Sequence, residues 1–361
     1  MDSKKIIITA GGTGGHIFPA IAVAMGLKDR GHNVLIVGDP KIKKYAIESG
    51  FDYRMVSSGY SLKNFRSLRN IIRGIWQSFA VVRRFMPDLV IGFGSYITLP
   101  MLVATRLKRI KFCLHEQNSH IGDVNRLFLK NAKCLFTSFQ EMYGININYS
   151  DKIFFAGSPI RRSVAKLCAV SEYKYPEDNE KFNILITSGS GGASFFSREF
   201  TKVFAHIKKE IKSKINIFHQ VKQEEELDIV KNFYSRELIK SEVKLFFEDM
   251  PEKLLKSHLA IARSGMGTAS ELAAMGRPTI FVPSPNVKNN HQLSNANFFK
   301  RNEACIVLEE NCFIPSDFAA RLESLIGSRE ELENLSANIR KLSAIDAEEK
   351  IVEYINDLLL L

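Results

Sequence analysis

Twice along its 361 residues the chain runs from a short apolar strand through a cluster of glycines into a helix. The first run has a strand at residues 4–10, the turn Gly11-Gly12-Thr13-Gly14-Gly15 and a helical pattern from Pro19 to Arg30. The second has a strand at 182–187, a turn at 188–192 and a helical pattern at 193–211. A buried strand that turns directly into a helix begins a βαβ unit, so the sequence predicts two parallel sheets covered by helices.

Further strands and helices alternate after each of these openings. We therefore expect two Rossmann-like, doubly wound parallel-sheet domains at residues 1–163 and 164–346, with a last helix at 347–361 that docks back on the first domain. Ligands of open parallel sheets bind at the carboxyl ends of the strands, so both glycine turns are expected to face one interdomain cleft. The strands expected after the two openings are 33–37, 89–92, 111–114, 134–137 and 152–155, then 215–219, 243–246, 259–262, 279–282 and 304–307.

The positive charge is concentrated in the first half of the chain. Residues 1–163 hold 24 basic and 10 acidic residues, a net charge of +14, whereas the remainder has a net charge of −3. Such asymmetry indicates an anionic partner for the first half, either nucleic acid, an acidic lipid surface or a phosphorylated substrate; the alternative is an ordinary basic surface. Helix-turn-helix, zinc-finger and RNP patterns are missing from the sequence, which disfavours nucleic acid.

Residues 61–87 carry no acidic side chain and combine basic with apolar residues. Leu68, Ile72, Ile75, Phe79 and Val82 recur at the helical period and are expected to pack in the core. Apolar residues off that stripe are candidates for contact with the interfacial zone of a bilayer. The expected membrane-contact residues of this segment are Phe65, Arg69, Ile71, Arg73, Ile75, Trp76 and Phe79.

The glycine turns favour phosphate binding because backbone N–H groups and a helix N-terminus can approach an anion there. Neither turn matches a P-loop, and the first is out of register for a dinucleotide fingerprint. His16 lies near the start of a helix, where the helix dipole disfavours imidazolium, so it is a candidate proton acceptor; the alternative is a histidine that only caps or packs.

Two further segments carry candidate ligand-binding groups. Residues 263–271 follow a strand and open a helix, and Glu271 can bridge two ribose hydroxyls or simply complement the dipole in the first helical turn. Residues 283–297 are rich in amides suited to a sugar. The dispersed histidines, cysteines and acids show no metal-ligand spacing, so we expect neither a cofactor nor a protein-held metal.

Six motifs together resemble the MurG family of peptidoglycan N-acetylglucosaminyltransferases: AGGTGGHIFPAIAVA (10–24), LHEQN (114–118), GSPIRR (157–162), SGSGGA (188–193), RSGMGTASE (263–271) and HQLSNA (291–296). The resemblance implies a GT-B fold and an inverting transfer of GlcNAc from UDP-GlcNAc. The implied acceptor is the C4 hydroxyl of the muramyl sugar of undecaprenyl-pyrophosphoryl-MurNAc-pentapeptide (lipid I), and the implied products are the β-1,4 disaccharide lipid II and UDP.

The resemblance also implies roles for matching positions. His16 and Glu116 are the catalytic candidates, with Glu116 a rival base or an orienting group. The acceptor pyrophosphate is expected at Gly11, Gly12, Thr13, Gly14, Gly15 and Tyr96. Within the donor, the uracil is expected at Arg161 and at the chain around Phe247. The donor as a whole is expected at Thr13, Gly14, Gly15, Asn118, Asn125, Arg161, Ser190, Phe247, Met266, Gly267, Thr268, Glu271, Gln292 and Asn295. The implied location is the cytoplasmic face of the bacterial inner membrane, as a peripheral protein with cell-wall synthesis proteins as possible partners.

The chain departs from the family pattern at Ser95, Leu99, Val221-Lys222 and Val287, which puts fine specificity in question. Three alternatives to the family activity stay open at this point. They are a GT-B transferase with another lipid acceptor, a sugar-nucleotide epimerase of the same architecture, and a catalytically inactive binding module recruited to membranes.

Overall fold

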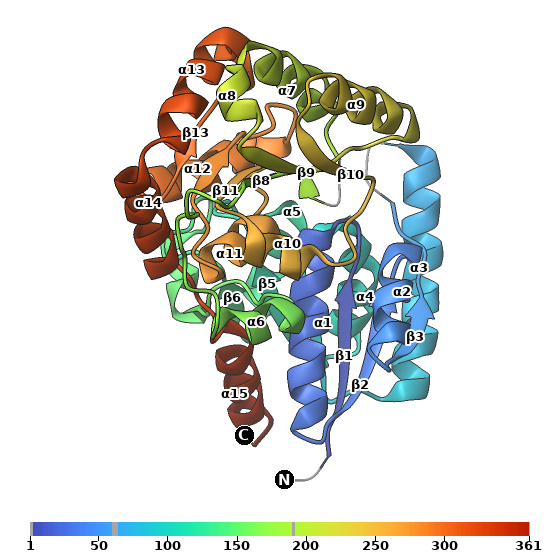
Figure 1. Cartoon of the computed structure of the whole chain (residues 1–361). Coiled ribbons are helices and arrows are strands. Elements are labelled where there is room, and N and C mark those ends of the chain that lie inside the picture. Colours follow the sequence, from blue (N-terminus) through green and yellow to red (C-terminus); the bar gives the residue numbers. More distant parts are fainter. Residues whose placement is uncertain (1–2, 60–63, 190–191, 361) are drawn as a thin grey trace. The chain divides into compact units, whose positions relative to one another are not determined.

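The computed structural model describes residues 3–59, 64–189 and 192–360, which form two compact units (Figure 1). Unit 1 comprises Met1–Arg161 and Ala344–Leu361, and unit 2 comprises Arg162–Ser343. The first segment of unit 1 thus ends at Arg161, two residues before the domain boundary expected at residue 163. Each unit is an α/β layer structure built on one parallel sheet, as alternating strands and helices require.

Unit 1 contains a seven-stranded parallel sheet in the order β3-β2-β1-β4-β5-β6-β7. Its central strand β1 pairs with β2 on one side and β4 on the other. One strand, β3, was not expected from the sequence, because this edge strand is short and its side chains are largely exposed. The bounds are β1 Lys5–Ala10, β2 Asn33–Gly38, β3 Asp52–Met55, β4 Leu89–Gly92, β5 Lys111–Glu116, β6 Leu135–Thr137 and β7 Ile153–Phe155.

The helices of unit 1 include one from the far end of the chain. An added Cβ at Gly26 of α1 would lie 2.8 Å from Val352 Cγ2 of α15, so the two helices pack closely. Ile351, Val352 and Ile355 join the buried apolar cluster that α1 and β1 form. The bounds are α1 Gly14–Asp29, α2 Pro40–Glu48, α3 Phe65–Phe85, α4 Ser95–Leu107, α5 Asp123–Phe128 and α15 Ala347–Leu360, with 3-10 turns η1 Leu129–Asn131 and η2 Ile147–Lys152.

The helix α3 buries a different face from the expected one. Its buried residues are Ile71, Gly74, Ser78 and Val82. An added Cβ at Gly74 would lie 1.8 Å from the carbonyl oxygen of Ser57, so small residues let this face approach the rest of the unit. Apolar periodicity does not detect such a face, because glycine and serine do not count as apolar.

Two expectations for α3 are therefore wrong. Ile71 is only 3% exposed and cannot contact a membrane, and Leu68 and Ile72 are 39% and 50% exposed rather than in the core. Ile75 and Phe79 are partly buried against the core. Phe65, Leu68, Ile72 and Trp76 instead form an exposed apolar stripe at helical spacing, in which Phe65 is 84% and Trp76 73% exposed.

Unit 2 contains a six-stranded parallel sheet in the order β10-β9-β8-β11-β12-β13. The strand β10 begins three residues earlier than expected, because this edge strand is polar and its apolar residues fall at its end and in the loop that follows. The strands are β8 Phe182–Thr187, β9 Ile215–Gln220, β10 Lys240–Lys244, β11 Leu259–Ala262, β12 Thr279–Phe281 and β13 Ile306–Val307.

The single helix expected at 193–211 is two helices, because the chain is extended at Ile207 and Lys208. The helices of unit 2 are α6 Arg162–Cys168, α7 Ser194–His206, α8 Lys209–Lys212, α9 Glu224–Arg236, α10 Met250–Lys256, α11 Met266–Ala274, α12 His291–Arg301, α13 Pro315–Ile326 and α14 Arg329–Lys341, with 3-10 turns η4 Lys288–Asn290 and η5 Glu310–Cys312. Within the described ranges, no helix of either unit combines the length and the apolar character that a bilayer span requires.

Candidate functional site

In unit 1 the turn between β1 and α1 is built around a buried carboxylate. An added Cβ at Gly11 would lie 2.8 Å from Asp39 Oδ1, and Gly12 has a φ of +86°, so both positions favour glycine. The N–H of Gly12 donates to Asp39 Oδ2 at 3.0 Å. The start of the turn is thus already engaged with a negative charge. An anionic ligand is better accommodated by the later residues of the turn, at the positive end of α1.

His16 is the third residue of α1 and is half-buried. Its Nδ1 lies 3.0 Å from Thr13 Oγ1. Its Nε2 side faces Gly94, where an added Cβ would lie 3.7 Å from Nε2 and 3.4 Å from Asn125 Nδ2. Gly94 has a φ of +75° and no side chain, and it thereby lets the imidazole of His16 and the amide of Asn125 lie over the same backbone position.

Glu116 is buried at the end of β5, which runs two residues further than expected. Its Oε1 accepts N–H groups from the backbone and the side chain of Asn118, at 3.1 and 3.4 Å. Its Oε2 accepts the backbone N–H of Gly122 at 2.8 Å and Asn125 Nδ2 at 2.9 Å. Burial raises the pKa of Glu116, and these donors oppose the rise. Both oxygens act as acceptors, which is the pattern of a carboxylate that organises a loop.

The neighbouring His115 is fully buried and stacks on Phe93 with ring centroids 5.0 Å apart. Burial, together with the proximity of His16, lowers the pKa of His115 to about 3. It is therefore neutral near pH 7 and unable to hold a proton taken from a substrate. Its place beneath the site is that of a packing residue.

Tyr96, an expected acceptor-pyrophosphate contact, donates its hydroxyl to Asp123 Oδ2 at 3.1 Å. The structure also shows the surroundings of two departures from the family pattern, Ser95 and Leu99. Ser95 has a φ of +66°, a conformation that favours glycine, while Leu99 lies in the core of the unit. Leu99 adds no polar group, whereas the hydroxyl of Ser95 lies 3.4 Å from the position of an added Cβ at Gly12, in the turn that leads to His16.

In unit 2 the turn after β8 lies against the start of α11. Gly189 has a φ of +68°, and an added Cβ there would lie 3.2 Å from Thr268 Oγ1. Met266, Gly267 and Thr268 are the first three residues of α11, whose first turn holds no acidic side chain. This pairing of a glycine turn with a helix N-terminus suits a diphosphate. The expected contact Ser190 lies outside the described residues.

Glu271 lies in the second turn of α11 and is nearly buried. The interpretation of this glutamate as a first-turn partner of the helix dipole is therefore wrong, because the helix begins at Met266 rather than later. Two vicinal hydroxyls of a ribose are suitable partners for a carboxylate, as the family resemblance implies for this position.

The amides of α12 tie that helix to the loop before α11. Asn295 is fully buried and donates to the carbonyl oxygen of Ser264 at 3.2 Å. Ser264 Oγ donates to the carbonyl oxygen of Gln292 at 2.7 Å, and Gln292 Oε1 accepts the N–H of Ser284 at 2.8 Å. Gln292 is only half-buried and can reach a ligand, whereas Asn295 supports the loop from behind.

The two residues expected beside a uracil differ in their surroundings. Phe247 is fully buried, with Lys253 Nζ 5.6 Å from its ring centroid, so its backbone rather than its ring can meet a ligand. Arg161 places its guanidinium 4.9 Å from the ring centroid of Phe18 in unit 1. Sequence reasoning missed Asp39, Gln220 and Lys253. Asp39 was detectable as a helix N-cap before Pro40, whereas the contacts of the other two depend on strand pairing and loop packing.

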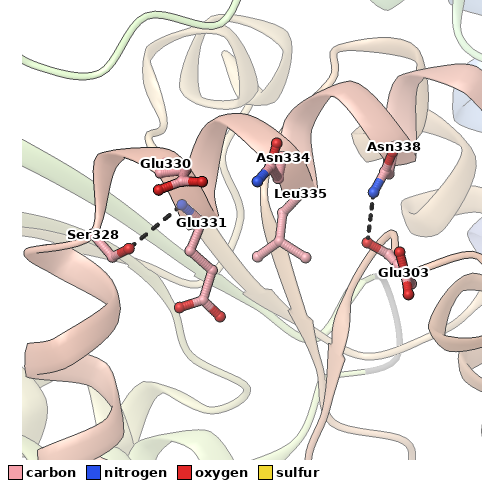
Figure 2. Close-up of a pocket in the computed structure, with 7 residues that line it drawn as sticks. All are labelled: Glu303, Ser328, Glu330, Glu331, Asn334, Leu335 and Asn338. Carbon is pink, nitrogen blue, oxygen red and sulfur yellow. Dashed lines mark hydrogen bonds between the residues drawn. The ribbon is translucent and has the colours of Figure 1, made fainter.

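A hollow in unit 2 lies along α14 and is lined by Glu303, Ser328, Glu330, Glu331, Asn334, Leu335 and Asn338 (Figure 2). Ser328 Oγ accepts the N–H of Glu331, and Asn338 Nδ2 donates to the carbonyl oxygen of Glu303 (Figure 2). The expected site residues are not among those that line it. Across the described parts of both units, His, Cys, Asp and Glu form no group of three or more that could hold a metal ion.

Comparisons with known proteins give a consistent result. The glycosyltransferase family 28 N-terminal domain matches residues 6–137, and the corresponding C-terminal domain matches residues 183–351. A UDP-N-acetylglucosamine–N-acetylmuramyl-(pentapeptide) pyrophosphoryl-undecaprenol N-acetylglucosamine transferase of Wolbachia pipientis is 34% identical over 339 residues, which cover 93% of this chain and 94% of that protein.

Two solved structures share the fold. The crystal structure of Acinetobacter baumannii MurG has a TM-score of 0.77 at 24% identity and covers 98% of this chain and 99% of its own. The glycotransferase of kitacinnamycin has a TM-score of 0.74 at 15% identity, with 99% and 100% covered.

Proposed function

The chain belongs to the MurG family of UDP-N-acetylglucosamine–N-acetylmuramyl-(pentapeptide) pyrophosphoryl-undecaprenol N-acetylglucosamine transferases, and from this premise we propose how it works. It has the GT-B fold, with two Rossmann-like domains. Its reaction is the inverting transfer of GlcNAc from UDP-GlcNAc to the C4 hydroxyl of the muramyl sugar of lipid I, which yields lipid II and UDP.

The observation that carries the proposal is the arrangement of His16 with Thr13, Asn125 and Glu116 in unit 1. The transfer needs a base for the acceptor hydroxyl, and a base must present a lone pair to that proton. If His16 Nδ1 carries hydrogen and donates to Thr13 Oγ1, which lies 3.0 Å away, then Nε2 keeps its lone pair on the side of Gly94 and Asn125. His16 is the base in this proposal.

The transfer then proceeds as a single displacement, in which one bond forms at the anomeric carbon and one breaks. The acceptor oxygen attacks the anomeric carbon of GlcNAc and gives its proton to His16 Nε2. The bond from the anomeric carbon to the UDP oxygen breaks, and its electron pair leaves with UDP. The negative charge that grows on UDP is stabilised by the first turn of α11 and by the glycine turn beside it. These groups supply the stabilisation without a protein-held metal.

Glu116 has a different role in this proposal. A carboxylate base would need an oxygen that can take the proton of the muramyl C4 hydroxyl. Both oxygens of Glu116 already accept two N–H groups each. Glu116 therefore holds Asn118 and Asn125 in place for the donor sugar. It is a positioning residue rather than a proton acceptor.

The exposed apolar stripe of α3 supports peripheral binding to an anionic membrane. Arg69 and Arg73 are exposed beside Phe65, Ile72 and Trp76, so one helix face combines apolar side chains with positive charge. Such a face inserts shallowly at the headgroup level and is attracted to acidic lipids. We propose that α3 holds the enzyme at the cytoplasmic face of the inner membrane, where a lipid-linked acceptor and other cell-wall synthesis proteins are within reach.

The decisive experiment incubates the purified protein with labelled UDP-GlcNAc, with and without a lipid-linked muramyl-pentapeptide. The expected result is UDP release that depends on the acceptor, together with a disaccharide-lipid product. His16→Ala is expected to abolish turnover with UDP affinity unchanged, and Thr13→Val to lower kcat while Thr13→Ser retains it. UDP binding without transfer to this acceptor would contradict the proposal and direct attention to other acceptors.

A further inference from the structure

The carboxamide of Gln220 connects two loops of unit 2, the loop that follows β8 and the loop that follows β10. Gln220 lies at the end of β9, the strand between them, and it is 5% exposed. The backbone registers reach Ile186↔His219 on one side and Lys244↔Gln220 on the other. Past these pairs, the N–H of Val221 donates to the carbonyl oxygen of Lys244 at 2.9 Å, and the side chain of Gln220 bonds to Thr187 in one loop and to Leu245 in the other.

Each end of the carboxamide bonds to one loop. Its Oε1 accepts the hydroxyl of Thr187 at 2.6 Å, and its Nε2 donates to the carbonyl oxygen of Leu245 at 3.2 Å. The oxygen of Thr187 in turn accepts the N–H of Gly189, 3.2 Å away. The Leu245 carbonyl fixes the orientation of the amide, because the reverse orientation would place two acceptor oxygens against each other.

The two loops are those assigned to opposite ends of the donor nucleotide. Gly189 belongs to the glycine turn against the start of α11, where the diphosphate is proposed to bind. Leu245 opens the loop that leads through Phe247, where the family resemblance implies a contact with uracil and the backbone is the part that can make it. Gln220 thus spans the distance between the phosphate end and the base end.

A second group fixes the far end of the base loop. Lys253 lies 3.2 Å from Asp249, contacts Glu242, and has its Nζ 4.5 Å from the ring centroid of Phe218. Its side chain is almost buried. The loop is therefore held at its end by Lys253, and Gln220 sets the position of its beginning relative to the glycine turn.

We propose that Gln220 is a positioning residue that holds the base loop and the diphosphate turn at the spacing of a nucleoside diphosphate. This proposal rests on the proposed function for the identity of the donor. The Gln220 link should strengthen the binding of a ligand that touches both loops and leave unchanged the binding of a ligand that touches one loop alone.

The test compares Gln220→Met with the wild-type enzyme by titration with UDP, uridine and inorganic diphosphate. Methionine keeps the length of the side chain and removes both hydrogen bonds. We expect the Kd for UDP to rise tenfold or more while those for uridine and diphosphate change less than twofold. The KM for UDP-GlcNAc should rise with it, and kcat should change less than threefold.

The matched control is Gln77→Met, because Gln77 in unit 1 also uses its carboxamide oxygen as an acceptor, in its case for the backbone N–H of Ser57 at 2.7 Å. It should leave all three affinities unchanged. Thr187→Val removes the same link from the other side while keeping shape. The double variant Thr187→Val with Gln220→Met should bind UDP no more weakly than Thr187→Val alone, since that variant already breaks the link to Gln220 and also removes the acceptor of the Gly189 N–H.

The proposal is overturned if Gln220→Met binds UDP within twofold of wild type, or if it weakens uridine and diphosphate as much as UDP. Should Gln220→Met fail to fold, the same criteria apply to Thr187→Val. Wild-type protein that binds UDP but transfers no GlcNAc would contradict the proposed function and leave this comparison decisive for Gln220. Wild-type protein that does not bind UDP would overturn both.

Discussion

A carboxylate that accepts four N–H groups has no lone pair in a good position for the hydroxyl of an incoming sugar. Glu116 is in that situation, whereas His16 has the hydroxyl of Thr13 beside Nδ1 and Gly94 on the side of Nε2. Both side chains can take a proton, but their hydrogen-bond partners differ. At the scale of single residues, hydrogen-bond partners therefore assign the roles of base and positioning residue.

Glu116→Gln tests that assignment. The new amide group would face one of the N–H donors, so a buried donor loses its acceptor and the free energy of unfolding falls by about 1–3 kcal/mol. We expect kcat to fall because Asn118 and Asn125 shift. The acidic limb of the kcat/KM pH profile should keep its position, because that limb reports the base. Loss of the limb in Glu116→Gln, with its retention in His16→Ala, would make Glu116 the base.

Two buried histidines make the stability of the protein depend on pH. Burial lowers the pKa of both His115 and His219 to about 3, from an ordinary value near 6.5. Between these values the unfolded chain binds protons that the folded chain does not. Stability is therefore complete above pH 6.5 and falls as the pH drops, by up to about 1.4 kcal/mol per pH unit for each histidine.

His219→Asn should remove the contribution of one histidine, because asparagine does not titrate and its amide can still reach Tyr234, whose hydroxyl lies 2.9 Å from His219 Nδ1. Urea unfolding at pH 7 and pH 5.5 measures the slope. The variant is expected to lose less stability on acidification than the wild type. An unchanged slope would show that His219 binds protons as readily in the folded protein as in the unfolded chain.

At the scale of elements, α3 shows how a helix can carry two apolar faces with different partners. The buried face uses Gly74 and Ser78 for close approach, and the exposed stripe uses bulky side chains. Large apolar residues left in water on one helix face, beside arginines, indicate a surface that another phase or partner covers. The packing of α3 thereby determines which of its residues are available to a membrane.

Trp76→Ser should weaken binding to vesicles that contain about a third anionic phospholipid, roughly tenfold or more, because burial of such a side chain contributes about 1.5–3 kcal/mol. Ile229→Ser is the matched control, since Ile229 is a similarly exposed apolar residue on α9 of unit 2. Vesicle co-sedimentation measures both. Equal effects of the two variants would exclude α3 as the membrane contact.

At the scale of the whole molecule, the chain leaves unit 1, builds unit 2 and returns to unit 1 with α15. The return is held by apolar packing and by a short hydrogen bond, 2.7 Å, between His32 Nε2 and Asn356 Oδ1. Unit 1 thus lacks part of its core until the end of the chain is in place. The stability of unit 1 therefore depends on residues at the opposite end of the chain from β1.

Ile355→Ala should lower the free energy of unfolding of unit 1 by about 2–5 kcal/mol, because a fully buried side chain leaves a cavity. Affinity for UDP, which rests on unit 2 residues, should stay within twofold. Leu360→Ala on the same helix, where the side chain is 65% exposed, should change stability by less than about 0.5 kcal/mol. Thermal unfolding and UDP titration check both variants. A small effect of Ile355→Ala would mean that α15 is not part of the unit 1 core.

Most of the strands and helices, the two glycine turns and the family resemblance were readable from the residues alone, because they depend on residue type and on neighbours in sequence. The edge strand β3 and the break between α7 and α8 were not. Positive φ at Gly12 and Gly189 and buried apolar strands such as Ile6–Ala10 are local consequences of residue type. Local signals also identified His16 as a candidate base, and the family resemblance added Glu116.

Tertiary structure alone decided which face of α3 is buried, that Glu116 has its acceptor positions filled, and that Gln220 connects two loops. Each of these depends on residues far apart in the chain meeting at one place. Gly74 meets Ser57, Glu116 meets Asn125, and Gln220 meets both Thr187 and Leu245. Residue type states what a side chain can bind, but strand pairing and helix packing determine which partners reach it and which surface it leaves exposed.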